Sequence, residues 1–257
     1  MFTHHRSVLV VAAGCLALSA CSGGPRSVAA DRSPAGTQAP GAPATARTGP
    51  APSPSVPLPK PGAAGEVPDT ARLRQLVLQP GEVPGVLAPE HGIRDVHPSE
   101  LRLDNPTQPG PAPCGTMWAL LGQRGAQAAV AQTFDSDEPG TPQATFLASH
   151  AGTGAATSFA QLRSAVADCP PHGYEGREAT VRVEDLDAAG FPEDTIRIRI
   201  TVHEEGSGAP DEVLDRIVSR VGVCVVDMVG MGPDPHPRLA EQPALRQIQR
   251  LRAAQGL

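Results

Sequence analysis

Segment 22–66 places the strongest constraint on how this chain can fold, because its composition prevents it from building a core. Its 45 residues include ten prolines and seven glycines, and most of the others are alanine, serine or threonine. Such a segment buries too little apolar surface to offset the conformational entropy that folding removes. We therefore expect residues 21–66 to be a disordered tether and residues 67–257 to form one domain.

The segment before the tether is typical of an exported protein. Residues 1–20 combine a basic start with an apolar stretch that is too short to span a membrane, as in a signal peptide. Leu18, Ser19, Ala20 and Cys21 resemble the lipobox of bacterial lipoproteins. This resemblance implies cleavage before Cys21 and a diacylglycerol on its sulfur, whose acyl chains, such as palmitate, hold the protein on the membrane. We expect the domain to lie in the cell-wall space, outside the cytoplasmic membrane.

The charge of the domain argues against a nucleic-acid partner. Residues 67–257 carry 16 basic and 25 acidic side chains. A protein that binds nucleic acid needs a basic surface to displace the counterions of the phosphates. An acidic domain also stands away from an anionic membrane surface.

Hydrophobic periodicity predicts an α+β fold, with a single antiparallel sheet and helices mainly on one face. A connection that is rich in proline, residues 79–113, separates the first helix from the rest. Loops of this length are usually functional or disordered, and its role stays open. We expect helices at 69–78, 114–122, 155–169 and 244–254, and strands at 126–134, 143–150, 180–184, 195–202 and 221–229.

Three of these elements carry more detailed predictions. Strict alternation over 195–202 predicts one buried face and one wet face. The nearly continuous apolar run 221–229 predicts a central strand that is covered on both faces. The spacing in the last helix predicts an inward face of Leu245, Ile248 and Leu251 and an outward face of Arg246, Arg250 and Arg252.

The domain retains three cysteines, which allow one disulfide and one free thiol. Cys114 follows a loop and Cys169 ends a helix, so both have freedom to meet. Cys224 lies among valines in a predicted strand, where a thiol behaves as a small buried hydrophobe. We favour a disulfide between Cys114 and Cys169, and pairings that use Cys224 stay open. A metal site is not expected, because no CxxC and no histidine at ligand spacing accompanies the cysteines.

The sequence contains none of the common catalytic or cofactor signatures, so we expect no enzyme and no cofactor. Ser149 and His150 are neighbours in a strand and point to opposite faces. Asp227 shares an apolar face and needs a partner, for which an arginine on a neighbouring strand is the ordinary answer. An acidic cluster is expected to be a solvated hairpin, with weak cation binding as the alternative: His203, Glu204, Glu205, Asp211, Glu212 and Asp215.

Four segments resemble a known extracellular domain. They read LRQLVLQPGEVPG from residue 73, SFAQLRSAVADC from 158, TVRVEDL from 180 and VSRVGVCVVDMVG from 218. Together with the lipobox and tether, they look like actinobacterial lipoproteins that share the sensor domain of the mycobacterial H-type receptor Ser/Thr kinase. The resemblance implies a ligand-binding domain with a cleft, no enzymatic activity and an undefined ligand. That domain has two intramolecular disulfides, whereas three cysteines permit one here.

The sequence thus favours a lipid-anchored surface protein whose domain binds a small molecule, a cell-wall fragment or a protein without catalysis. The ligand-contacting residues are unknown. Two alternatives stay open, which are a cell-wall hydrolase with an unfamiliar site and a structural or assembly factor of the envelope. The first predicts a pocket with paired carboxylates or a perturbed histidine, and the second predicts an exposed apolar patch.

Overall fold

A computed structural model of the chain describes residues 56–63, 66–101, 110–135, 142–173, 178–234 and 239–257. The predicted signal peptide, Cys21 and most of the expected tether lie outside these ranges. None of the helices within them is long and apolar enough to cross a membrane.

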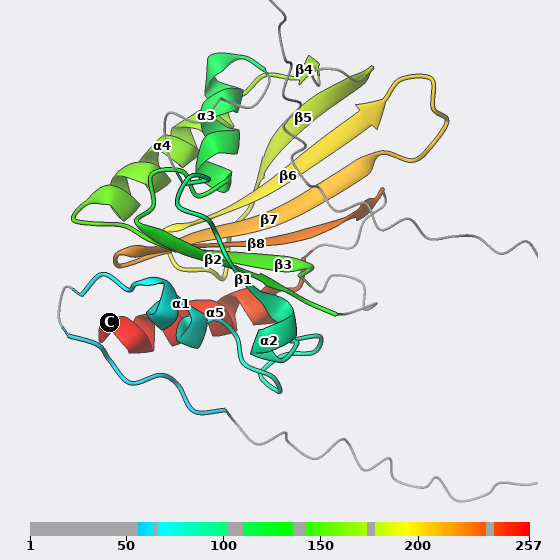
Figure 1. Cartoon of the computed structure of the whole chain (residues 1–257). Coiled ribbons are helices and arrows are strands. Elements are labelled where there is room, and N and C mark those ends of the chain that lie inside the picture. Colours follow the sequence, from blue (N-terminus) through cyan, green and yellow to red (C-terminus); the bar gives the residue numbers. More distant parts are fainter. Residues whose placement is uncertain (1–55, 64–65, 102–109, 136–141, 174–177, 235–238) are drawn as a thin grey trace, which may run out of the picture. The chain divides into compact units, whose positions relative to one another are not determined.

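An eight-stranded antiparallel sheet forms the centre of the domain, in the order β1-β2-β3-β8-β7-β6-β5-β4 (Figure 1). This sheet confirms the predicted α+β class. The strands are β1 Ile93–Asp95, β2 Ala128–Thr133, β3 Ala144–Ser149, β4 His172–Gly173, β5 Ala179–Leu186, β6 Thr195–Glu204, β7 Glu212–Val221 and β8 Cys224–Pro233.

Helices cover both faces of the sheet, whereas we expected them mainly on one. Helices α3 and α4 pack on one face, and α1 and α5 pack on the other (Figure 1). The reason lies in β7 and β8, whose apolar side chains point both ways: Ile217 belongs to the core under α5 and its neighbour Val218 to the core under α4. The helices are α1 Thr70–Leu76, α2 Pro89–Gly92, α3 Ala112–Leu121, α4 Gly154–Asp168 and α5 Glu241–Gln255.

The prediction for β6 was right on one face and wrong on part of the other. Ile196, Ile198 and Ile200 face the core under α3 and α4, as expected. On the opposite face Arg197 is buried rather than wet, because α5 covers it. Its guanidinium donates a hydrogen bond of 3.0 Å to Glu241 in the first turn of α5.

The predicted strand 221–229 overlaps β8, which is central and covered on both faces as expected, but its first residues belong to β7 and to the turn between the two strands. Val221 ends β7 and pairs with Cys224 at the start of β8, so Gly222 and Val223 form a tight turn. Gly222 adopts φ of +57°, which glycine tolerates and hairpin turns of this kind require. Sequence analysis missed β7 because charged residues interrupt its apolar pattern.

The long connection 79–113 contains ordered structure where it is described. Val86 forms a bridge with Phe134, and β1 pairs with β2 along its whole length. Helix α2 connects these two contacts. The connection therefore extends the sheet by an edge strand.

The register of α5 differs from the prediction. Ile248 and Leu251 are buried as expected, but Leu245 is 40% exposed. Arg250, expected outward, is 3% exposed, and Arg246 is half-buried. The side chains that complete the buried face are Ala244, Gln247 and Ala254.

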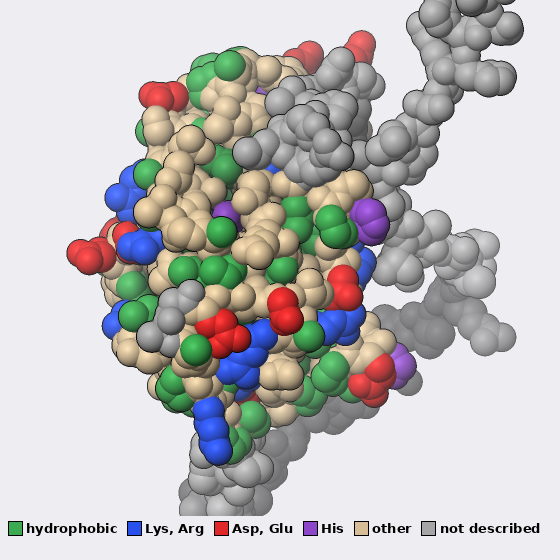
Figure 2. Space-filling view, turned by 60° about the vertical axis from the view of Figure 1, so that its left-hand side comes forward, with side chains coloured by type: hydrophobic (Ala, Val, Ile, Leu, Met, Phe, Trp, Pro, Cys, Tyr) green, Lys and Arg blue, Asp and Glu red, His purple; other side chains and the backbone are tan. Residues whose placement is uncertain are grey.

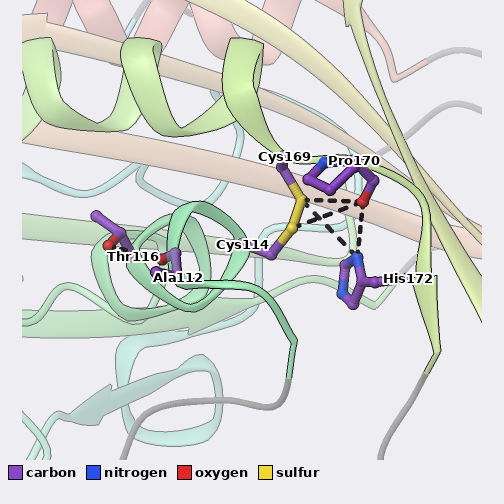
Figure 3. Close-up of a disulfide and its surroundings, with 6 residues drawn as sticks. All are labelled: Ala112, Cys114, Thr116, Cys169, Pro170 and His172. Atoms are coloured by element: carbon purple, nitrogen blue, oxygen red, sulfur yellow. Dashed lines mark hydrogen bonds between the residues drawn. A yellow bond between two sulfur atoms is a disulfide. The ribbon is translucent and has the colours of Figure 1, made fainter.

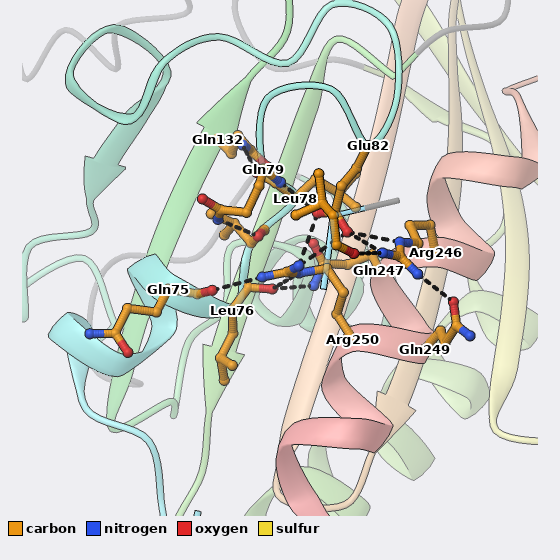
Figure 4. Close-up of polar contacts among 12 residues, drawn as sticks. Gln75, Leu76, Leu78, Gln79, Glu82, Gln132, Arg246, Gln247, Gln249 and Arg250 are labelled. Carbon is orange, nitrogen blue, oxygen red and sulfur yellow. Dashed lines mark hydrogen bonds and ion pairs between the residues drawn. The ribbon is translucent and has the colours of Figure 1, made fainter. Parts of the chain in front are cut away.

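Arg250 is buried and Arg246 is half-buried because both pair with one carboxylate in the connection after α1 (Figure 4). The side chain of Glu82 is fully buried and lies 2.7 Å from Arg246 Nη2 and 3.0 Å from Arg250 Nη1. Arg250 Nη2 also donates to the Gln75 carbonyl at 2.9 Å, near the end of α1. This ion network fastens α5 to α1 and to the start of the connection.

Candidate binding site

Three hollows follow one end of the sheet, around the turn between β7 and β8. The first measures about 210 Å³ and lies between residues 62–63, α1 and the end of α5. We call it the strap hollow, because residues 62–63 belong to a segment, 56–63, that lies across α1 and α5 like a strap. The second, the edge hollow, measures about 300 Å³ and lies between α5 and residues 192–194. The third, the helix hollow, measures about 470 Å³ and follows the outer side of α4.

Neighbouring hollows share lining residues, so they lie next to one another, and we call the three together the belt. Gly222 and Leu257 line both the strap hollow and the edge hollow. Asp194 and Arg220 line both the edge hollow and the helix hollow. A ligand that crosses the shared residues contacts both α4 and α5 beside the ends of β6 and β7.

An ion pair divides the edge hollow from the helix hollow. Arg220, at the end of β7, pairs with the carboxylate of Asp194, which precedes β6. The Arg220 amide also donates to the Asp194 carbonyl at 2.9 Å, which fixes the backbone beneath the pair. Beside it, the hydroxyls of Thr195 and Ser219 are 2.8 Å apart and buried. The ridge between the two hollows is thus held by both side chains and backbone.

The belt is lined by four arginines and three acidic residues: Arg72, Arg163, Arg220, Arg252, Glu66, Glu193 and Asp194. Arg163 lies with its guanidinium 5.2 Å from the centre of the Phe159 ring and donates to the Glu193 carbonyl at 3.1 Å. Arg252 is exposed in the edge hollow and forms no ion pair with the described residues. Figure 2, which brings one side of the domain forward, shows basic and acidic side chains next to one another. The belt can offer donors to an anionic group and apolar surface to the rest of a ligand.

The disulfide favoured from the sequence is present in the structure. Cys114 in α3 is joined to Cys169, which follows α4, at 2.06 Å (Figure 3). The bond fastens the two helices of this face to each other. The ring of His172 lies beside it, and its Nδ1 is 3.0 Å from the Pro170 carbonyl. Cys114, Cys169 and His172 are close enough to hold a metal ion, but sulfurs joined in a disulfide are not thiolate ligands.

Cys224, which the sequence left open, is a buried free thiol. Burial raises the pKa of this thiol to about 12, so it is protonated at neutral pH. It packs in the core under α1 and α5.

The charged residues singled out in the sequence form ordinary ion pairs. Asp227 is fully buried, and its two carboxylate oxygens accept hydrogen bonds from Nε and Nη2 of Arg216 in β7. The partner is thus an arginine on a neighbouring strand, as predicted. Burial raises the pKa of Asp227, and Arg216 opposes this shift. The predicted hairpin is the one between β6 and β7, but Asp215 is buried in β7 and accepts two hydrogen bonds of 2.7 Å from Arg199. His203 and Asp211 pair at 2.7 Å across the ends of β6 and β7.

Ser149 and His150 do not form a catalytic pair. Ser149 Oγ donates to the Pro68 carbonyl at 2.6 Å. The His150 ring is 2% exposed, and its Nδ1 has no hydrogen-bond partner among the described residues. Burial lowers the pKa of His150, opposed by a hydrogen bond with the backbone of Gly125. An adjoining cavity of about 10 Å³ has room for one water molecule.

Sequence reasoning missed the belt and the Glu82 network. The signal for Glu82 was weak, because an acidic residue in a proline-rich connection is usually solvated. The residues of the belt come from five separate segments, and their approach depends on the sheet order.

A comparison with solved structures finds a distant likeness. The extracellular domain of PknH from Mycobacterium tuberculosis is similar to this chain, with 14% sequence identity and a TM-score of 0.43. The likeness covers 73% of this chain and 96% of that chain. No protein-family model matches the chain, and no curated protein matches it.

Proposed function

We propose that this chain is a lipid-anchored surface protein whose domain binds a ligand or partner without catalysing a reaction. Cys21 would carry the diacylglycerol, and the tether would hold the domain in the cell-wall space outside the cytoplasmic membrane. The belt of three hollows is the proposed binding site. The observation that carries this proposal is the adjacency of the three hollows, which share Asp194, Arg220 and Gly222 as lining residues.

The lining of the belt fits a ligand with an apolar body and an anionic group. Small side chains of α4, such as Ala156 and Ala160, leave room in the helix hollow, and the Phe159 ring gives it an apolar wall. Arg163 and Arg252 provide exposed guanidinium groups on either side of the ridge. Guanidinium groups bind carboxylate and phosphate through paired hydrogen bonds. A small molecule, a cell-wall fragment or an acidic protein segment would meet these requirements.

The anchor is tested by Cys21→Ala in the organism that makes the protein. We expect the variant to be released to the medium, because it lacks the sulfur that would be acylated. Mass spectrometry of the wild type should show a chain that begins at Cys21 and carries diacylglycerol. A variant that stays in the membrane fraction would contradict the anchor.

The site is tested by native mass spectrometry of the full chain, extracted from its membrane in mild detergent. We expect a bound mass that is released on activation and is lost in Ala160→Trp, which fills the helix hollow, and in Arg252→Glu. Arg182→Glu is the matched control, since Arg182 is exposed on β5 and lines none of the three hollows. A wild type without a bound mass, or variants that retain it, would contradict the proposed site.

A further inference from the structure

Residues 56–63, which we call the strap, lie on α1 and α5 although they were expected to belong to the disordered tether. Arg246 Nη2 donates to the Val56 carbonyl at 2.7 Å, and Arg72 Nη2 donates to the Lys60 carbonyl at 2.8 Å. The Gly62 amide donates to the Ala254 carbonyl in α5 at 2.9 Å. Three hydrogen bonds, spaced along the strap, therefore hold it on the domain.

These contacts use the main chain of the strap. Pro57, Pro59 and Pro61 alternate with the residues between them and have no amide hydrogen to donate. The alternation favours an extended strand whose carbonyls remain available to outside donors. The strap also donates one hydrogen bond, from the Gly62 amide to the Ala254 carbonyl. This carbonyl lies in the last turn of α5 and has no partner within the helix. The surface of α1 and α5 thus matches a proline-rich strand.

Arg246, which binds the Val56 end of the strap, is held in place whether or not the strap is docked. Arg246 Nε donates to Glu82 at 2.8 Å while its Nη2 reaches Val56. Because Glu82 is buried and also binds Arg250, the Arg246 guanidinium keeps its position when the strap leaves. Little side-chain entropy is lost on docking at this point.

Other features favour easy release. Every side chain of the strap is exposed or only half-buried, so no apolar side chain has to leave a core when the strap is released. Each of the three hydrogen bonds is replaced by bonds to water when the strap leaves. Pro68 is buried, so the chain is fixed to the domain from that residue onward.

We propose that the strap is a reversible clasp between the domain and its tether. Docked, it shortens the tether and closes the strap hollow, of which Gly62 and Ala63 form one wall. Released, it opens this hollow and frees the chain up to Pro68, which adds the twelve residues 56–67 to the tether, about 37 Å if extended. A molecule that fills the strap hollow against this wall stabilises the docked state, and docking strengthens its binding equally. The clasp itself does not depend on the lipid anchor or on the identity of any ligand.

The test uses a fluorophore on Lys60, which is the single lysine of the chain. The side chain of Lys60 is exposed, and only its carbonyl contacts the domain, so labelling leaves the contacts in place. The N-terminal amine, with its lower pKa, is capped first near pH 7. Time-resolved anisotropy of the full chain then reports whether the strap tumbles with the domain.

We expect the wild-type label to tumble mainly with the domain, and this fraction to fall at least threefold in Gly62→Pro and in Arg72→Ala. The first variant removes the amide that binds Ala254 at an exposed position, and the second removes the donor to Lys60 at a half-buried position. Arg94→Ala is the control, because Arg94 is exposed and pairs with Glu100 away from the strap. Hydrogen exchange should show at least tenfold protection at Gly62 in the wild type, which Arg72→Ala reduces.

Two results would overturn the clasp. The first is a wild-type label that moves freely, together with an unprotected Gly62 amide. The second is a label that stays rigid in both Gly62→Pro and Arg72→Ala. Since the label reports docking alone, either result would leave the proposed ligand site to be judged by its own experiment.

Discussion

The two faces of the sheet hold their helices by different chemistry. On one face, α3 and α4 are joined by the disulfide between Cys114 and Cys169 over an apolar core. On the other face, α1 and α5 are joined by the buried ion network of Glu82, Arg246 and Arg250. The disulfide acts largely by restricting the unfolded chain, whereas the network acts only in the folded state. A domain can therefore brace one face covalently and leave the other able to exchange contacts with a strap.

The largest expected effect comes from removing the covalent brace. In Cys114→Ala with Cys169→Ala, we expect the free energy of unfolding to fall by about 4 kcal/mol, because the bond closes a loop of more than 50 residues. Urea unfolding followed by circular dichroism measures this loss. Cys224→Ala is the control for cysteine removal and should cost less, because Cys224 is unpaired. Equal losses in the two proteins would show that the disulfide does not brace this face.

A smaller effect is expected from breaking the ion network. Glu82→Ala leaves Arg250, which is 3% exposed, without a carboxylate, and we expect a loss of about 3 kcal/mol in the free energy of unfolding. Glu90→Ala in α2 is the matched control, since Glu90 is exposed, and should change stability by less than about 0.5 kcal/mol. If Glu82→Ala were as stable as its control, the two faces would not differ as described.

The smallest expected effect is a pH dependence of stability that comes from the face of the sheet covered by α3 and α4. His150 lies beside α3 and α4, and burial holds its pKa below the ordinary value of 6.5. The unfolded chain therefore binds the proton first, so stability is complete above pH 6.5 and is lost as pH falls toward the folded pKa. The slope is at most about 1.4 kcal/mol per pH unit for one proton.

The measurement is the urea midpoint between pH 7 and pH 5 in the wild type and in His150→Gln. We expect the variant to lose less stability over this range than the wild type. His91→Gln provides the control, because His91 is exposed in α2, and should follow the wild type. Identical slopes in the wild type and His150→Gln would show that His150 does not contribute.

Local sequence patterns correctly predicted the elements whose surroundings stay the same along their whole length. Alternation identified the buried face of β6, and the Cys114–Cys169 pair followed from the flexibility expected at each cysteine. The pattern failed where an element changes partners along its length. The turn at Gly222 was hidden in an apolar run, and Arg250 was assigned to the surface because a helical pattern does not reveal a buried carboxylate 168 residues away.

The belt could not be predicted for the same reason. Asp194 and Arg220 meet because β6 and β7 are neighbours and because their ends coincide in register. Nothing near either residue in the sequence specifies that register. The strap was also unpredictable from composition, since its docking depends on Arg72, Arg246 and Ala254 rather than on its own side chains.

The burial of Cys224 affects how copies of this protein can coexist. Thiol exchange requires a thiolate that can reach a partner, and a buried thiol with a pKa of about 12 supplies neither. Once the chain has folded with Cys114 joined to Cys169, it offers no reactive sulfur within the described residues. Many copies crowded together under oxidising conditions would therefore remain covalently separate, despite an odd number of cysteines in the domain.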